Sequence, residues 1–308
     1  TEYMGGKVPS EAQVRFVGAL PECRERYFLG TPGCGKSTSL IAEVNRYCLT
    51  YPGSVWLLAR YTETEAASVL RGDFENETPR EILTRWDGDE RRWYYRNGSS
   101  VYIHGLKAAE GQAPFSKGAG YSLSGVAISQ VEALPDYEWV GELRDRNRHQ
   151  NPPRLFLAEG NVNITRDHWL FKLVDSSRAI EEKRLYRSGP RMVLIGNLAD
   201  NAKNLPADSV ERLRTDFPPG HPLYGPKVGG WFGPGESGDP VYGPELFRQE
   251  VHLRTVEYDP KFPLLEAWDF GIARPAVLWS QFLSGPRYRA LGEWMGNDTP
   301  LGDAARES

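Results

Sequence analysis

Short apolar runs alternate with helix-like segments through most of the first 200 residues. Four of these runs have the length and continuous hydrophobicity of strands buried on both faces, at residues 27–29, 54–60, 124–128 and 154–158. Residues 37–44 and 63–70 have helical patterns and follow the first two runs. Strands that alternate with helices predict an α/β fold, in which helices cover both faces of a parallel sheet.

Two further patterns interrupt this alternation. Asn97-Gly98 separates two β-rich runs within residues 93–103, which predicts a hairpin. Pro and Gly recur at almost every second or third position of residues 217–244, which is typical of a linker or irregular subdomain and not of regular helix or central strand. Beyond that stretch, residues 264–271 and 276–282 predict two successive strands. We therefore expect three parts, at residues 1–215, 216–260 and 261–308.

Composition narrows the class of protein. A chain of 308 residues with 40% hydrophobic and 25% charged residues is typical of a globular protein that exceeds a single core. The sequence contains no apolar run long enough to span a membrane and no secretory leader pattern. Three cysteines without metal-ligand spacing predict reduced thiols. A net charge of −4 neither supports nor excludes nucleic acid, because basic residues can gather on one face.

Residues 30–37 match the phosphate-binding loop pattern G-x-x-x-x-G-K-[ST] between a predicted strand and a predicted helix. Glycines in such a loop let backbone N–H groups face phosphates, and the helix N-terminus adds partial positive charge. Lys36 would reach the β- and γ-phosphates of ATP, and the Ser37 hydroxyl would ligate Mg²⁺. The residues expected to bind the nucleotide here are Gly30, Thr31, Pro32, Gly33, Cys34, Gly35, Lys36, Ser37 and Thr38. The alternative is a glycine-rich turn that contains Lys and Ser by chance.

Hydrolysis requires an acidic residue that polarises the attacking water, usually at the tip of a neighbouring strand. The first acid after the run at residues 124–128 is Glu132, which we predict to be the catalytic carboxylate. Ser129 stands where an Asp that holds Mg²⁺ is expected. The alternative for Glu132 is a residue that opens a helix, where its charge suits the helix dipole.

A nucleotide site also needs a pocket for the base. Gln13 precedes the loop, and its amide can offer a donor and an acceptor to the adenine edge. Arg60 ends the second predicted strand and could stack on the base or bind phosphate. The alternatives are an ordinary exposed helix residue for Gln13 and a surface Arg for Arg60.

With these residues in place, the chain resembles the large terminase subunit of tailed bacteriophages, an ATP-driven motor that packages double-stranded DNA into a capsid. The resemblance covers nearly the whole chain and depends on the order and spacing of its motifs. Asn161 and Asn163, followed by His168-Trp169, resemble the segment that couples ATP hydrolysis to movement in the family. The other matching positions are Gln13, residues 30–37, 128–134 and 142–146, Trp231, Gly243 and Phe247.

Residues 268–271 and the following Arg274-Pro275 resemble the first strand of the family's RNase H-like nuclease domain. The resemblance implies that Asp269 is the first carboxylate of a nuclease site that binds two divalent metals. The remaining acids are expected farther downstream than residue 308, so this chain is not expected to cut DNA. The alternative for Asp269 is a residue that caps a turn. The three parts are then a P-loop ATPase domain (1–215), a Gly/Pro-rich linker or subdomain (216–260) and the N-terminal fragment of the nuclease domain (261–308).

The resemblance also implies partners and a location. We expect a homo-oligomeric ring that acts on double-stranded DNA with a small terminase subunit and a portal or procapsid, without a membrane, in the cytoplasm of an infected bacterial host. Such motors often take a basic residue from the neighbouring subunit, and the candidates here are Lys117, Arg144 and Arg146. Solvated surface charge is the alternative for each.

Two other functions are compatible with a phosphate-binding loop. A helicase-like ATPase that remodels nucleic acid would place a second ATPase-like lobe where this chain has the Asp269 strand. A nucleotide-binding switch or scaffold without activity is suggested by Ser129 and Gln130, which stand in place of the usual Asp-Glu pair. ATP turnover abolished by Glu132→Ala would eliminate this last function.

Overall fold

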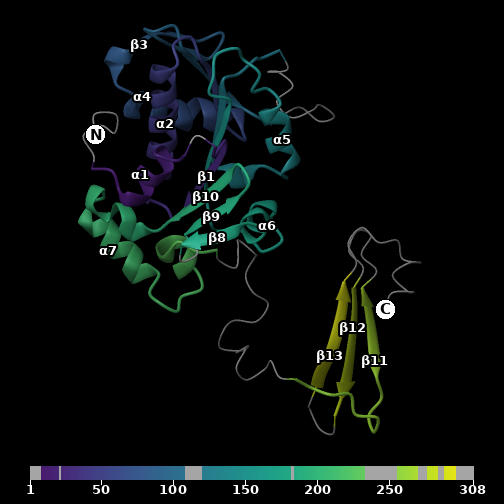
Figure 1. Ribbon diagram of the computed structural model, residues 1–308. Helices are drawn as coiled ribbons and strands as arrows, with labels where there is room; N and C mark the ends of the chain where they lie inside the picture. The colour runs from purple at the N-terminus through teal and green to yellow at the C-terminus, as the bar shows by residue number, and fades with distance from the viewer. Residues whose placement is uncertain are drawn as a thin grey trace. The chain divides into compact units, whose positions relative to one another are not determined.

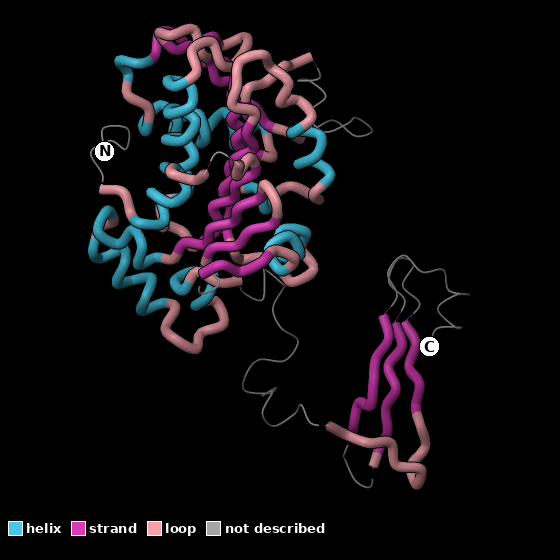
Figure 2. The backbone as a smooth tube through the Cα atoms, viewed as in Figure 1, coloured by secondary structure: helices cyan, strands magenta, loops and turns pink. Residues whose placement is uncertain are grey.

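The computed structural model describes residues 8–20, 22–107, 120–181, 184–232, 255–269, 276–283 and 288–295. The chain divides into two compact units, Thr1–Gly238 and Asp239–Ser308. Figure 1 shows that the first unit contains a large sheet between helices, and Figure 2 shows that the described part of the second is built from strands. The predicted boundaries at residues 215 and 260 stay predictions.

The sheet of the first unit has the strand order β3-β4-β5-β2-β6-β7-β1-β10-β9-β8. Six central strands are parallel: β5 (Ser100–Gly105), β2 (Val55–Arg60), β6 (Gly125–Ser129), β7 (Leu155–Asn161), β1 (Glu25–Gly30) and β10 (Arg191–Gly196). Antiparallel strands flank them: β3 (Leu83–Asp87), β4 (Arg92–Tyr95), β8 (Arg178–Glu181) and β9 (Leu185–Ser188). The predicted hairpin at Asn97-Gly98 joins β4 to β5 and is confirmed.

Helices cover both faces of this sheet, as Figure 1 shows. One face packs against α1 (Glu11–Val17), α2 (Lys36–Thr50) and α4 (Arg71–Glu77), which follows α3 (Glu63–Glu65) and a π-helix (Ala66–Leu70). The other face packs against α5 (Glu138–Arg144) and α6 (Trp169–Asp175). Successive β1 residues belong to opposite cores, since Phe28 packs with the α2 side and Leu29 with the α6 side. The predicted α/β fold is confirmed.

A buried ion pair ties α2 to β1. The side chains of Arg26 and Glu43 are fully buried, and Arg26 Nη1 lies 2.7 Å from Glu43 Oε1. Arg26 also donates through Nε to the carbonyl oxygen of Cys23 and through Nη2 to Tyr47 Oη. Burial raises the pKa of Glu43 against the opposing effects of Arg46 and Arg26. Glu43 also accepts from the partly exposed Arg46 at 2.7 Å. Removing Glu43 would therefore leave the Arg26 charge buried without its carboxylate partner, which is strongly destabilising.

The glycine- and proline-rich stretch begins within the first unit. It follows a 3₁₀-helix (Leu198–Asn204) and α7 (Ala207–Asp216), and it forms a π-helix at Gly225–Gly229. The sequence predicted no regular helix in this stretch, so the π-helix is a difference from that prediction. The helix tolerates Pro226 because the proline lies in its first turn, where the missing N–H has no partner to lose. Gly230 ends the helix with a left-handed φ of 80°. Val228 packs against Leu198 and Val210. Gly243 and Phe247 lie outside the described residues.

The second unit contains a three-stranded antiparallel sheet in its described part, with the order β11 (Leu265–Asp269), β12 (Ala276–Phe282), β13 (Tyr288–Met295). Asp269 is exposed at the end of β11, opposite Ala276. Phe270, Gly271, Arg274 and Pro275 lie outside the described residues. Across the described ranges of the chain, every helix is too short or too polar to cross a membrane.

Candidate nucleotide-binding site

The loop at residues 30–37 connects β1 to the 15-residue helix α2. It lies at the carboxyl end of the parallel strands, where open α/β sheets bind ligands. Gly35 has a left-handed φ of 89°, and a Cβ there would lie 2.4 Å from Gln13 Nε2. A Cβ on Gly30 would lie 2.3 Å from the carbonyl oxygen of Gly196. The backbone therefore requires glycine at both positions.

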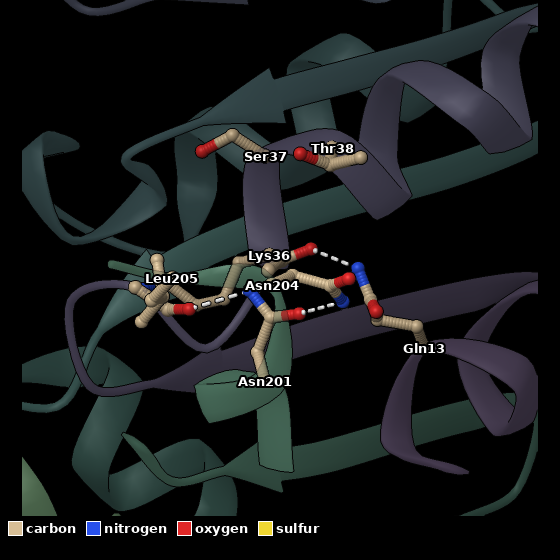
Figure 3. Close-up of a pocket in the computed structure, with 9 residues that line it drawn as sticks. Gln13, Lys36, Ser37, Thr38, Asn201, Asn204 and Leu205 are labelled. Atoms are coloured by element: carbon tan, nitrogen blue, oxygen red, sulfur yellow. Dashed lines mark hydrogen bonds between the residues drawn. The ribbon is translucent and has the colours of Figure 1, made fainter. Parts of the chain in front are cut away.

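A cavity of about 230 Å³ borders this loop and is called the Gln13 cavity below. Figure 3 shows Gln13 beside the loop, Ser37 and Thr38 at the start of α2, and Asn204 between Gln13 and Asn201. The lining residues are Gln13, Gly33, Gly35, Lys36, Ser37, Thr38, Asn201, Asn204 and Leu205. Gln13 is buried, accepts from Ser10 N through Oε1 at 2.8 Å and donates to the carbonyl oxygen of Gly35 at 3.1 Å. The structure thus brings the predicted Gln13 to the predicted loop.

Two asparagines of this cavity were missed by sequence reasoning. Asn201 donates through Nδ2 to the carbonyl oxygen of Gly33 at 2.8 Å, and Asn204 donates to Asn201 Oδ1 at 2.8 Å. Both lie on the 3₁₀-helix that follows β10, and β10 pairs in parallel with β1. The sequence does show a polar segment after the apolar run that begins at Met192. That this segment lies beside the loop, however, depends on the order of the strands in the sheet.

The loop's own side chains are largely enclosed. Lys36 is buried, and its Nζ donates to the carbonyl oxygen of Thr31 at 2.9 Å, so the ammonium lies against the curved backbone of the loop. Burial raises the pKa of the Cys34 thiol, which keeps it protonated and unreactive. Pro32 faces a different cavity from Gly33 and Gly35.

A buried carboxylate that sequence reasoning did not assign lies beside Ser37. Glu159 on β7 is 2% exposed, and its Oε1 accepts from Ser129 Oγ at 2.6 Å and from Ser37 Oγ at 3.2 Å. Ser129 on β6 is the direct neighbour of Glu159 in the sheet register. Arg60 at the end of β2 donates to Ser129 Oγ at 3.2 Å. Arg60 therefore lies on the Ser129 side of the loop and does not line the Gln13 cavity.

Glu132 lines a second cavity of about 270 Å³, called the Glu132 cavity below, together with Pro32, Asn161, Asn163, Pro226 and Lys227. Asn161 Nδ2 donates to Glu132 Oε1 at 2.7 Å. Glu132 Oε2 is buried and has no hydrogen bond within the described residues. Burial and the nearby charge of Glu159 raise the pKa of Glu132 to about 7. The structure thus brings Glu132 together with the two predicted coupling asparagines at the edge of the loop.

Helix α6 is tied to the chain segment that carries Glu132. His168 caps α6 by accepting from Leu170 N through Nδ1, so its Nε2 carries the proton and donates to the carbonyl oxygen of Glu132 at 3.0 Å. Trp169 Nε1 donates to the carbonyl oxygen of Leu134 at 2.7 Å. Two hydrogen bonds therefore join α6 to the segment that carries Glu132.

The described basic residues that were predicted to act on a neighbouring subunit lie away from the loop. Arg144 pairs at 2.9 Å with Glu25, the first residue of β1, which is the opposite end of that strand from the loop. Arg146 accepts through its carbonyl oxygen from Leu123 N, just before β6, and also lies at that end of the sheet. Lys117 lies outside the described residues. No group of three or more His, Cys, Asp or Glu side chains that could hold a metal occurs within the described part of the chain.

Neither a protein-family model nor a curated protein matches this chain. Its fold is similar to the large terminase of a thermophilic bacteriophage, with a TM-score of 0.59 and 15% identity over 98% of this chain and 73% of that one. Further structures of that terminase contain ATP-gamma-S or ADP. The large terminase of bacteriophage HK97 matches with a TM-score of 0.53 and 10% identity over 94% of this chain and 63% of that one.

A structure of an isolated large terminase ATPase domain is also similar to this chain. The large terminase ATPase domain of Thermus phage P74-26 matches with a TM-score of 0.51 and 15% identity over 75% of this chain and 96% of that domain. The large terminases and the isolated domain both match through their overall fold. This chain therefore has the fold of phage large terminases.

Proposed function

We propose that this chain is the ATP-hydrolysing subunit of a motor that translocates double-stranded viral DNA into a procapsid. The observation that carries the proposal is the arrangement of the loop at residues 30–37, with the Gln13 cavity on one side and the Glu132 cavity on the other. Support comes from the shared fold and from the nucleotides bound in the large terminase of the thermophilic bacteriophage.

The nucleotide would lie across the loop, with its phosphates at the N-terminus of α2. Backbone N–H groups of the loop and the dipole of a 15-residue helix favour anions at this position. The Lys36 ammonium, which donates to a backbone carbonyl of the loop, would donate to phosphate oxygens there. The base would occupy the Gln13 cavity, where the Asn201 and Asn204 amides add hydrogen-bonding groups.

The residues beside the loop fit Mg²⁺. The Ser37 hydroxyl and the Glu159 carboxylate are oxygen ligands of the kind that Mg²⁺ prefers, and they converge at 3.2 Å. When bound, Mg²⁺ would neutralise the negative charge that develops on the phosphate oxygens, and Ser37 and Glu159 would hold it.

Glu132 is suited to accept a proton from the attacking water. A general base works best when its pKa is close to the working pH, and burial brings the pKa of Glu132 to about 7. Asn161 fixes one carboxylate oxygen at 2.7 Å, which leaves the other oxygen to accept the proton. Asn161 and Asn163 line the same cavity and would sense the state of the γ-phosphate. The bonds from His168 and Trp169 would pass a change at Glu132 to α6.

The proposed motor is an assembly of several copies of this chain with other phage proteins. A homo-oligomeric ring would let a basic residue of one subunit reach the site of the next, from among Lys117, Arg144 and Arg146. Within the same chain, Lys227 already lines the Glu132 cavity. The small terminase subunit, the portal and the procapsid would be partners in the cytoplasm of an infected bacterium. In the complete protein, Asp269 would contribute to a nuclease site for two divalent metals in an RNase H-like domain.

ATP turnover with and without DNA tests the proposal. We expect ATPase activity that duplex DNA stimulates, that Lys36→Ala abolishes through loss of binding, and that Glu132→Gln abolishes with binding retained. The exposed residues Lys203 and Glu138 provide matched controls, Lys203→Ala and Glu138→Gln, which keep activity. DNA affinity should fall steeply with salt and show no sequence preference. ATP turnover that DNA and capsid components leave unchanged would remove the main support for a motor.

A helicase-like ATPase remains the alternative function. It would require a second ATPase-like lobe after residue 238. The described residues of the second unit instead form a three-stranded antiparallel sheet. This observation favours the packaging motor.

A further inference from the structure

We infer that Glu159 supplies the carboxylate for the nucleotide's Mg²⁺, in place of the Asp that is expected at Ser129, and that Ser129 positions it. The inference rests on the proposed function, since it concerns the metal of the same nucleotide site. It assigns the metal carboxylate to β7, the strand between the loop strand β1 and the strand β6 that normally carries it.

Three donors converge on one oxygen of Glu159. Oε1 accepts from Ser129 Oγ at 2.6 Å, from Ser37 Oγ at 3.2 Å and from Gln130 N at 3.2 Å. Within the described residues, no group donates to the other oxygen, Oε2. A carboxylate held through one oxygen, with its second oxygen unpaired, fits a residue that offers a ligand to a cation.

The charge of Glu159 needs compensation, because the residue as a whole is buried. Glu159 is 2% exposed, and a buried carboxylate without compensation is costly. Arg60 donates to Ser129 Oγ and lies 3.9 Å from Asp73, and within the described residues it forms no ion pair with Glu159. The two hydroxyls and one amide at Oε1 stabilise the charge in part, and a divalent cation beside Ser37 would supply the remainder.

The local sequence and backbone are compatible with a metal carboxylate on β7 and a supporting hydroxyl on β6. Ser129 and Glu159 are opposite each other in the parallel register of β6 and β7, and both side chains lie on the α2 side of the sheet. An Asp at position 129 would bring a second carboxylate against Glu159, and like charges at that distance disfavour each other. Ser129 instead donates a hydrogen bond. Gln130 follows with a left-handed φ of 58°, and its N–H donates to Glu159 Oε1.

Few protein ligands are expected at such a site. Mg²⁺ bound with a nucleotide usually takes one or two protein ligands and completes its octahedron with phosphate oxygens and water. Ser37 and Glu159 supply that number. The lack of a larger group of acids in the described part of the chain is therefore consistent with a nucleotide-dependent metal site.

Binding of Mn²⁺ to the ADP complex tests the inference without measuring turnover. Mn²⁺ prefers the same oxygen ligands as Mg²⁺, and its electron paramagnetic resonance signal reports ligation. Altering a group that only supports a metal ligand typically costs 10–100-fold in affinity, so loss of the ligand itself in Glu159→Gln should weaken Mn²⁺ binding at least about 10-fold. Ser129→Ala, which removes the 2.6 Å hydrogen bond, should weaken it about 10-fold.

Two further variants make the test specific. Ser129→Asp combined with Glu159→Gln returns the carboxylate to β6 and should restore most of the lost affinity. Glu77→Gln removes an equal charge from a residue that accepts from Thr38 Oγ1 at 3.2 Å, and it should leave Mn²⁺ affinity unchanged. Loss of affinity in Glu77→Gln equal to that in Glu159→Gln would indicate a general effect of charge and overturn the inference.

Nucleotide binding in EDTA separates this inference from the proposed function. If ADP binds without metal and Glu159→Gln and Ser129→Ala bind Mn²⁺ as tightly as the wild type, the inference is wrong and the proposed function stands. If ADP does not bind to the wild type under any condition, the proposed function itself is wrong. Circular dichroism of each variant establishes that it is folded before its affinity is compared.

Discussion

Replacing Glu132 by Gln should stabilise the protein at pH 8 and leave its stability almost unchanged near pH 4.5. Burial and the charge of Glu159 raise the pKa of Glu132 from its ordinary value of 4.5 to about 7. The unfolded chain therefore releases this proton at a lower pH than the folded chain. Between these pH values the folded state binds more protons, so the free energy of unfolding falls as pH rises.

The size of the effect follows from the two pKa values. At about 1.36 kcal/mol for each pKa unit, the rise from 4.5 to about 7 corresponds to roughly 3 kcal/mol above pH 7. Gln is uncharged at every pH, and its side-chain oxygen can still accept from Asn161. The variant should therefore gain up to roughly 3 kcal/mol over the wild type at pH 8, while losing ATP turnover.

Urea unfolding followed by tryptophan fluorescence, in EDTA and without nucleotide, measures this difference. With an m-value of about 3 kcal/mol per M, the midpoint at pH 8 should move up by about 1 M urea. Glu138→Gln on the exposed side of α5 is the matched control and should move the midpoint little at either pH. An equal difference between Glu132→Gln and wild type at both pH values, or a less stable variant at pH 8, would refute the reasoning.

Three other predictions concern the same unit. ATP turnover should rise with pH, because Glu132 accepts a proton only when ionised and burial raises its pKa; a rate that does not depend on pH between 5 and 8 would exclude this role. Gly35→Ala should lose about 1–2 kcal/mol from its left-handed backbone and weaken nucleotide binding, whereas Gly72→Ala, with no atom near the added methyl, should be neutral or stabilising by thermal unfolding. Glu43→Met should cost about 3–5 kcal/mol in urea unfolding, because Arg26 then remains fully buried without its carboxylate partner; a loss below 1 kcal/mol would contradict the role of that pair.

The parts of the fold that depend on local pattern were predictable from the sequence. The loop at residues 30–37 has a pattern in which each fixed residue has a separate physical role, and the flanking strand and helix are where it requires them. Asn97-Gly98 predicted the β4–β5 hairpin because tight turns between strands need a residue with a left-handed backbone, and Gly98 supplies it with a φ of 83°. Apolar runs predicted the parallel strands because both of their faces are buried.

Features that depend on distant partners were not predictable. The predicted strand at residues 27–29 begins at Glu25 in the structure, because Glu25 and Arg26 are buried through partners far along the chain. Glu25 is paired with Arg191 and Arg144, and Arg26 with Glu43. Apolar periodicity alone cannot show such compensation.

The same limit applied to the candidate site. Glu159 directly follows the apolar run at residues 154–158, which was a usable signal, but its contact with Ser37 depends on β7 lying between β6 and β1. Asn201 reaches Gly33 only because β10 pairs with β1 on the other side. Arg60 ended a strand as predicted, yet strand order placed it beside Ser129 and away from the Gln13 cavity.

Binding of ATP-gamma-S, measured by titration calorimetry at millimolar Mg²⁺, tests the central claim most directly. The account predicts saturable binding to one site per chain, lost in Lys36→Ala and retained in Lys203→Ala. An absence of binding by the folded wild type, or equal binding by Lys36→Ala, would contradict the claim that the loop at residues 30–37 holds the nucleotide.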